Sequence, residues 1–171
     1  MTLAHDLFAE FKTECAITRR HLEAVPAEKF SWKPHAKSMD LGAIAGHLAE
    51  NPSWVVGMFD EDLDFDSMMK DYKPFVPKSK KELLDTFDTS VRDFFAKLEK
   101  ATDAHLSAEW KATMGGKVVM RGPRHVHLRS IGIHHMIHHR GQMTVYLRML
   151  DIPVPPSYGP TADVEWDPTK S

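Results

Sequence analysis

The sequence has little of several residue types, and each shortage excludes a class of protein. Cys15 is the one cysteine among 171 residues, so no disulfide can form within the chain, and we expect a reducing, cytoplasmic location. No apolar run approaches the roughly 18 residues of a membrane span. The amino-terminal stretch MTLAHDLFAEFK lacks a basic segment followed by an apolar one. We therefore expect neither a signal peptide nor a membrane partner.

The chain also lacks a large excess of charge of either sign. The chain has 22 Lys+Arg against 24 Asp+Glu, a formal net charge of −2 at pH 7. This balance gives no electrostatic reason to expect nucleic acid as a partner. A Ser-His-Asp set, a phosphate-binding loop and zinc-finger spacing are missing as well. The apolar fraction of 42% is ordinary for a globular protein, and the length suits one domain over residues 1–171.

Four segments have the apolar periodicity of amphipathic helices. The first spans residues 3–22 and ends before VPAEKFSWKP. The second begins near Ser38, a predicted N-cap, and places Asp40 in its first turn, where the helix dipole favours a carboxylate. The third opens with SKKE, in which Ser79 and Glu82 have the spacing of a capping box. The fourth follows RGPR and runs to about Leu150.

The connection between the third and fourth segments contains the stretch WKATMGGKVVM. Gly115-Gly116 between two short apolar runs is typical of a β-hairpin turn. Four amphipathic helices of about 20 residues predict an all-α protein. We expect an antiparallel four-helix bundle with a short β-hairpin between its third and fourth helices.

Histidines are the residue type that the chain has in excess. Eleven are present, and HHMIHHRGQ, residues 134–142, holds four within six positions. Residues four apart on a helix lie on one face, so two imidazoles at that spacing can bind one divalent ion. The fourth segment offers two such pairs, His134 with His138 and His135 with His139. Apolar residues occur nearly all round this segment, so periodicity does not choose between the pairs.

A third ligand must come from another helix. His47 in GAIAGHLAEN is the natural candidate, because it borders the apolar stripe of the second segment and faces a neighbouring helix. The alternative is that the histidines form a solvated face or hydrogen-bond to carboxylates. Cys15 lies on an apolar stripe and is more typical of a core residue than of a nucleophile. Trp32 and Trp54 are candidates for the mouth of a pocket.

Two stretches carry a family resemblance that covers most of the chain. HHMIHHRGQMTVYLRMLDIPVPPSYGPTAD resembles the DinB/YfiT-like superfamily of metal-binding four-helix bundles. FSWKPHAKSMDLGAIAGHLAENPSWV resembles the second-helix region of that family, whose single histidine is a ligand. The element HRGQ, preceded four residues earlier by another histidine, is similar to the ligand pair of the family.

The resemblance implies a ligand set for one divalent metal, which would be Zn²⁺, Ni²⁺, Fe²⁺ or Mn²⁺. The implied ligands are His47, His135 and His139. Flanking histidines, including His134 and His138, are then non-ligands. Arg140 is expected in a structural ion pair, and Gln142 either lines the cavity or hydrogen-bonds behind a ligand.

Three protein ligands leave a coordination position open, as in a catalytic site. The resemblance implies a metal-dependent enzyme, such as a transferase that uses a low-molecular-weight thiol and a small-molecule substrate. A metal-dependent hydrolase is the alternative reaction. A metal-binding or sensing domain without turnover, and a structural bundle that serves dimerisation, are the alternatives of other classes. We also expect a homodimer, because long amphipathic bundles often bury leftover apolar surface in a two-fold interface.

Overall fold

Side-chain caps begin the long helices of the computed structural model, which describes residues 2–164. Helix α1 (Leu3–Ala24) starts after Thr2, whose hydroxyl accepts the His5 N–H at 3.2 Å. Helix α2 (Leu41–Trp54) starts after Asp40, whose carboxylate accepts the Ala43 N–H at 2.7 Å. Asp40 is therefore the N-cap, and the prediction of Ser38 as the cap is wrong. A carboxylate at this position both caps the free N–H groups and matches the helix dipole.

The third long helix, α4 (Lys80–Leu98), starts after Ser79, as its sequence predicted. The Ser79 hydroxyl accepts the Glu82 N–H at 3.1 Å. The reciprocal bond differs from a standard capping box, because Glu82 accepts the N–H of Lys78 at 2.6 Å instead of that of Ser79. Either arrangement satisfies two backbone donors at the start of the helix.

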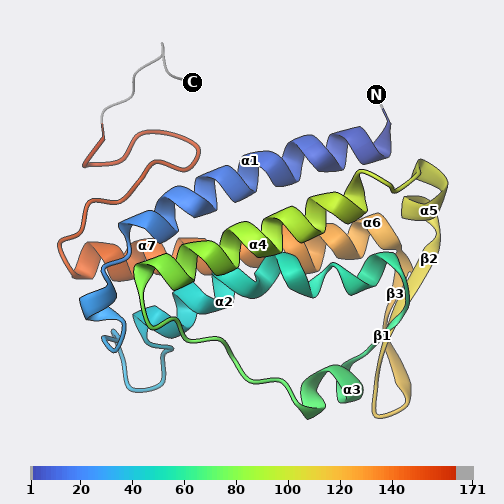
Figure 1. Cartoon of the computed structure of the whole chain (residues 1–171), viewed down its shortest axis with the longest axis horizontal. Coiled ribbons are helices and arrows are strands. Elements are labelled where there is room, and N and C mark those ends of the chain that lie inside the picture. The colour runs from blue at the N-terminus through green and yellow to red at the C-terminus, as the bar shows by residue number, and fades with distance from the viewer. Residues whose placement is uncertain (1, 165–171) are drawn as a thin grey trace.

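The carboxy-terminal helical segment is divided into three parts. Helix α6 (Arg124–His127) continues as a π-helical segment, Leu128–His134, and then as helix α7 (His135–Met149). The sequence predicted one regular helix here. Figure 1 shows α6 and α7, in orange, following one another behind α4.

The four longest helices lie side by side, and α1 and α2 each pack against both α4 and α7 (Figure 1). Their apolar faces meet in one core, in which Leu7, Phe11, Leu48, Phe87, Phe94, Met136 and Met143 are almost fully buried. Burying each large apolar side chain stabilises the fold by roughly 1.5–3 kcal/mol. The prediction of a mainly helical protein is therefore confirmed.

A small sheet at one end departs from the all-α expectation. Strands β2 (Glu109–Met114) and β3 (Lys117–Pro123) pair antiparallel, and Gly115 and Gly116 between them have φ values of 57° and 71°. Positive φ at both positions suits glycine and the right-handed twist of the strands. A third strand, β1 (Leu63–Asp64), pairs parallel with β2. The sequence did not predict β1, because two residues carry no periodicity.

Short elements complete the chain. Helix α3 (Phe65–Lys70) follows β1, and helix α5 (Asp103–Ser107) precedes β2. Two 3-10 helices, Ala27–Lys29 and Gly57–Phe59, connect the longer elements. Within residues 2–164, no helix combines the length and the apolar character that crossing a bilayer requires.

Candidate metal centre

Three histidines from two helices converge between α2 and α7. His47 lies in the middle of α2, His135 is the first residue of α7, and His139 is one turn further along α7. Each offers a ring nitrogen within 4.8 Å of the others, and each is half-buried. The Nε2 atoms of His47 and His135 are 2.9 Å apart. The structure thus brings together the three residues that the family resemblance implied.

The other histidines of the cluster lie elsewhere. His134, the last residue of the π-helical segment, and His138 of α7 are both exposed. His127 is buried, and its ring packs against Trp110 with centroids 5.0 Å apart. His125 approaches the Arg129 guanidinium at 3.3 Å. Among residues 2–164, the only group of three or more His, Cys, Asp or Glu side chains with metal-binding geometry is His47, His135 and His139.

The π-helical segment determines where α7 begins on the surface of α2. Asn51 of α2 donates from Nδ2 to the carbonyl oxygen of Ile131 at 2.9 Å, inside that segment. Gly132 lies so close to α1 that an added Cβ would be 2.7 Å from the Phe11 ring. Isolated π-turns often occur at functional sites. Here the π-turns directly precede His135, so they place the first ligand of α7 opposite His47.

Burial keeps the three imidazoles neutral. Desolvation, followed by the neighbouring imidazoles, lowers the pKa of His47 and of His135 to about 4. Desolvation likewise lowers the pKa of His139, although its hydrogen bond to Gln142 works in the opposite direction. A histidine with a lowered pKa is unprotonated at pH 7 and keeps a lone pair on one ring nitrogen. That is the state that a metal ligand requires.

Gln142 fixes the orientation of one ring. Its side-chain Oε1 is 2.7 Å from His139 Nδ1. A carbonyl oxygen can only accept, so Nδ1 carries the proton and the lone pair is on Nε2. Metal-binding histidines commonly donate their second ring N–H in this way. Of the two roles considered for Gln142, the structure therefore supports the hydrogen bond behind a ligand.

The donor set fits a divalent transition-metal ion. Two imidazole nitrogens at 2.0–2.1 Å from a tetrahedral ion are about 3.3 Å from each other. The 2.9 Å between His47 and His135 is within a small ring rotation of that value. The two imidazole rings have lowered pKa values, and their adjacent nitrogens point to one position. A shared cation at that position would stabilise them more than their contact with each other does.

Aromatic and acidic side chains lie beside the histidines, among them Trp54, which the sequence indicated as a candidate for the mouth of a pocket. The Trp54 ring is 4.6 Å from that of His47 and 5.5 Å from that of His135, edge-on in both cases. Tyr72 packs edge-on against Trp54 at 6.3 Å and donates its hydroxyl to Glu50 at 3.1 Å. His47, Glu50 and Trp54 are spaced i, i+3, i+7 on α2, a pattern that would have indicated their common face.

Arg140 and Cys15 have the structural roles that the sequence predicted, Arg140 in an ion pair and Cys15 in the core. Arg140 is 2% exposed, and its guanidinium pairs with the Glu14 carboxylate at 2.8 Å. It also donates to the Thr18 hydroxyl at 3.0 Å and to the Tyr158 hydroxyl at 2.6 Å. Cys15 is buried, and desolvation raises the pKa of its thiol to about 12. A thiol in this state is inert, so Cys15 is a core residue.

Comparison with known proteins now places the chain. The model of the DinB family matches residues 1–168. The chain belongs to the DinB family. The curated protein YrdA of Bacillus subtilis, described as uncharacterized, is 28% identical over 165 residues, which cover 96% of this chain and 92% of YrdA.

Two solved DinB-like structures share the fold of this DinB-family protein. One, from Bacillus cereus, has a TM-score of 0.73 at 24% identity and covers 92% of this chain and 98% of its own. The other, from Bacillus subtilis, has a TM-score of 0.69 at 18% identity and covers 89% and 97%. At these identities the likeness concerns the fold alone.

Proposed function

We propose that this DinB-family protein is a metal-dependent enzyme in which His47, His135 and His139 bind one divalent ion. The observation that carries the proposal is the convergence of three half-buried imidazoles whose ring nitrogens all lie within 4.8 Å. Zn²⁺, Ni²⁺, Fe²⁺ and Mn²⁺ all suit imidazole donors. We further infer that the four long helices act as an antiparallel bundle that holds the three ligands in place, and that the protein works as a homodimer in the cytoplasm.

Three ligands favour catalysis over a purely structural site. Structural zinc sites are closed by four protein ligands, whereas catalytic sites keep one position for a molecule from solution. No fourth His, Cys, Asp or Glu joins the group within residues 2–164. The ligands are half-buried, so small molecules can reach them from solvent. A sensing domain without turnover would bind the same ion but would not need this open side.

A thiol-dependent transferase is the reaction that we favour. A divalent ion held by His47, His135 and His139 would supply a Lewis acid that lowers the pKa of a thiol or a water molecule. The one cysteine of the chain is not available as a nucleophile, because Cys15 is buried and its pKa is about 12. A low-molecular-weight thiol from solution would fill that role. Trp54 and Tyr72 would exclude water beside it, and Gln142 would hold the His139 ring through the proton on Nδ1.

A metal-dependent hydrolase is the second candidate reaction. The Glu50 carboxylate lies one turn from His47 on the same face of α2 and is held by Tyr72 and by the Phe75 N–H at 3.3 Å. A carboxylate in that position is a candidate general base for an attacking water. The thiol reaction needs no such base, so the two reactions differ in their dependence on Glu50.

Metal analysis followed by activity screening tests the proposal. Protein purified without a histidine tag should contain about one divalent ion per chain, and the loaded protein should conjugate small thiols to electrophiles faster than thiol alone. Glu50→Gln should leave thiol conjugation nearly unchanged but abolish any ester or amide hydrolysis. His138→Ala, which alters an exposed neighbour, is the matched control. A fully loaded protein without turnover on either substrate class would contradict the enzymatic proposal and favour a sensing role.

A further inference from the structure

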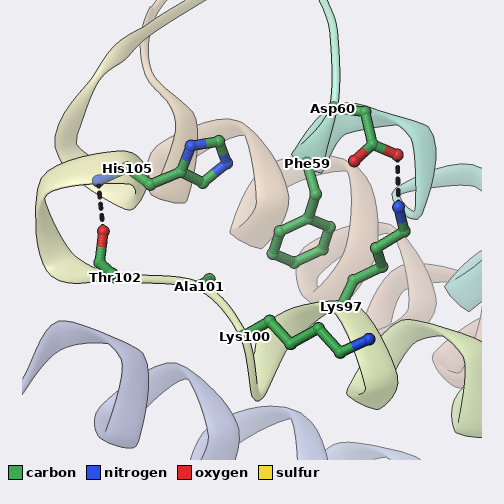
Figure 2. Close-up of a pocket in the computed structure, with 7 residues that line it drawn as sticks. All are labelled: Phe59, Asp60, Lys97, Lys100, Ala101, Thr102 and His105. Atoms are coloured by element: carbon green, nitrogen blue, oxygen red, sulfur yellow. Dashed lines mark hydrogen bonds and ion pairs between the residues drawn. The ribbon is translucent and has the colours of Figure 1, made fainter.

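A groove beside the carboxy-terminal end of α4 shares no residue with the metal centre. Its volume is about 390 Å³, and it lies between the end of α4, helix α5 and the 3-10 helix after α2. We call it the basic groove. Its lining residues are Phe59, Asp60, Lys97, Lys100, Ala101, Thr102 and His105. Figure 2 shows their side chains around one hollow, with His105 and Phe59 on one side and Lys100 across from them.

The charge of the groove is positive, although the whole chain carries −2. Lys97 pairs with Asp60 at 2.5 Å, so these two charges offset each other. The Lys100 ammonium and the His105 ring form no side-chain hydrogen bond or ion pair with any residue of 2–164. The nearby Asp103 carboxylate is turned to α1, where it accepts the N–H groups of Leu3 and Ala4, each at 3.0 Å. Lys100 is therefore the uncompensated charge.

Polar and apolar surfaces meet inside the groove. The Thr102 hydroxyl oxygen accepts the His105 N–H at 3.2 Å, which leaves its hydrogen free to donate to a ligand. Phe59 is 5% exposed and packs against Phe94 with ring centroids 5.7 Å apart, so its ring is held in place and presents a small apolar surface to the groove. Ala101 adds a second small apolar surface. The donors and these apolar surfaces lie on the same hollow (Figure 2).

We propose that the basic groove binds a small organic anion, with a carboxylate or phosphate group on Lys100, His105 and Thr102 and an apolar body against Phe59. Ammonium, imidazole and hydroxyl donors suit such an anionic group, since charge-assisted hydrogen bonds are the stronger ones. The volume is within the range of small-ligand sites, which are typically about 300–1,000 Å³. The proposal does not depend on the function proposed for the histidines, because the two sites have no residue in common.

NMR titration of the full-length, ¹⁵N-labelled protein with four probes tests this assignment. Phenyl phosphate and benzoate carry both an anionic group and an apolar ring, whereas inorganic phosphate and phenol carry one each. We expect phenyl phosphate, benzoate or both to give saturable shifts at residues 59–60 and 97–105. Inorganic phosphate and phenol should each bind at least fivefold more weakly. The ratio between phenyl phosphate and benzoate identifies which anionic group the site prefers.

Variants separate a built site from general attraction to a lysine surface. Lys100→Met and His105→Ala should each weaken binding of the better ring-bearing anion about tenfold, because each removes one charge-assisted donor. Lys81→Met is the matched control: Lys81 lies on the same helix, its side chain is 83% exposed, and its removal should change affinity less than twofold. His47→Ala should also leave the affinity unchanged. Shifts that do not saturate, or equal losses in Lys81→Met and Lys100→Met, would overturn the proposal.

Discussion

Two pairs of histidines lie at the same spacing where the π-helical segment joins α7, and their surroundings are opposite. His135 and His139 face α2, where His47 meets them. His134 and His138 precede them by one residue each and are exposed. One residue rotates a side chain by about 100° about the helix axis. Spacing alone therefore creates a potential metal pair, whereas the rotation of the helix decides which pair becomes a site.

The rotation of α7 is fixed by what lies on its other side. Arg140 follows His139 directly and reaches α1, where Glu14 and Thr18 hold its guanidinium. Met136 and Met143 are fully buried on the same side. A helix held by a buried ion pair and an apolar face has little freedom to turn. His135 and His139 are therefore kept at the edge of the core, half-buried and directed toward α2.

The largest stability effect is expected when the Arg140 anchor is removed. Arg140→Met keeps the side-chain volume but leaves the Glu14 carboxylate buried without its cation, which should cost about 3–5 kcal/mol in the free energy of unfolding. Urea denaturation measures it. Arg148→Met is the matched control, because Arg148 is half exposed in its pair with Asp163, and surface ion pairs contribute little to stability. Equal losses in the two variants would show that Arg140 does not anchor the helix.

A smaller effect is expected at the hydrogen bond that distinguishes the two pairs. Gln142 is exposed and contacts His139 Nδ1, so Gln142→Leu should leave folding stability nearly unchanged while the metal dissociation constant rises about 10- to 100-fold. Competition with a chromophoric chelator measures the constant. Gln142→Glu, which retains an acceptor for Nδ1, should restore most of the affinity. Unchanged affinity in Gln142→Leu would mean that the His139 ring is oriented without this bond.

Much of the fold follows from local sequence signals, and the exceptions have physical causes. The Ser79 cap and the glycine pair at 115–116 were readable because caps and tight turns depend on adjacent residues. Strand β1 was not, because its pairing with β2 joins segments far apart in the chain. The hydroxyl of Thr113 donates to the Asp64 carboxylate at 3.2 Å, and the N–H of Lys111 donates to that of Asp62 at 3.0 Å. In the sequence, these acidic residues indicate only negative charge and not a pairing with β2.

The choice between the histidine pairs could not be made from periodicity, and α7 shows why. Val145 and Met149 are each 56% exposed on the helix that carries the cluster, so apolar residues do not mark its buried side. The π-helical segment before His135 adds a second difficulty. Its i→i+5 turns shift the helical register, so buried His127 does not share a face with exposed His134, although a regular helix would align them. The family motif supplied what periodicity lacked.

The most direct test compares metal content in His138→Ala and His139→Ala, two variants that remove adjacent imidazoles from one helix. Each tag-free protein is loaded with one equivalent of Zn²⁺, dialysed and analysed by mass spectrometry for bound metal. His139→Ala should lose most of its metal, because one of three converging ligands is gone, whereas His138→Ala should retain about one ion per chain. If His138→Ala loses the metal and His139→Ala keeps it, the assignment of His47, His135 and His139 as the metal centre is wrong.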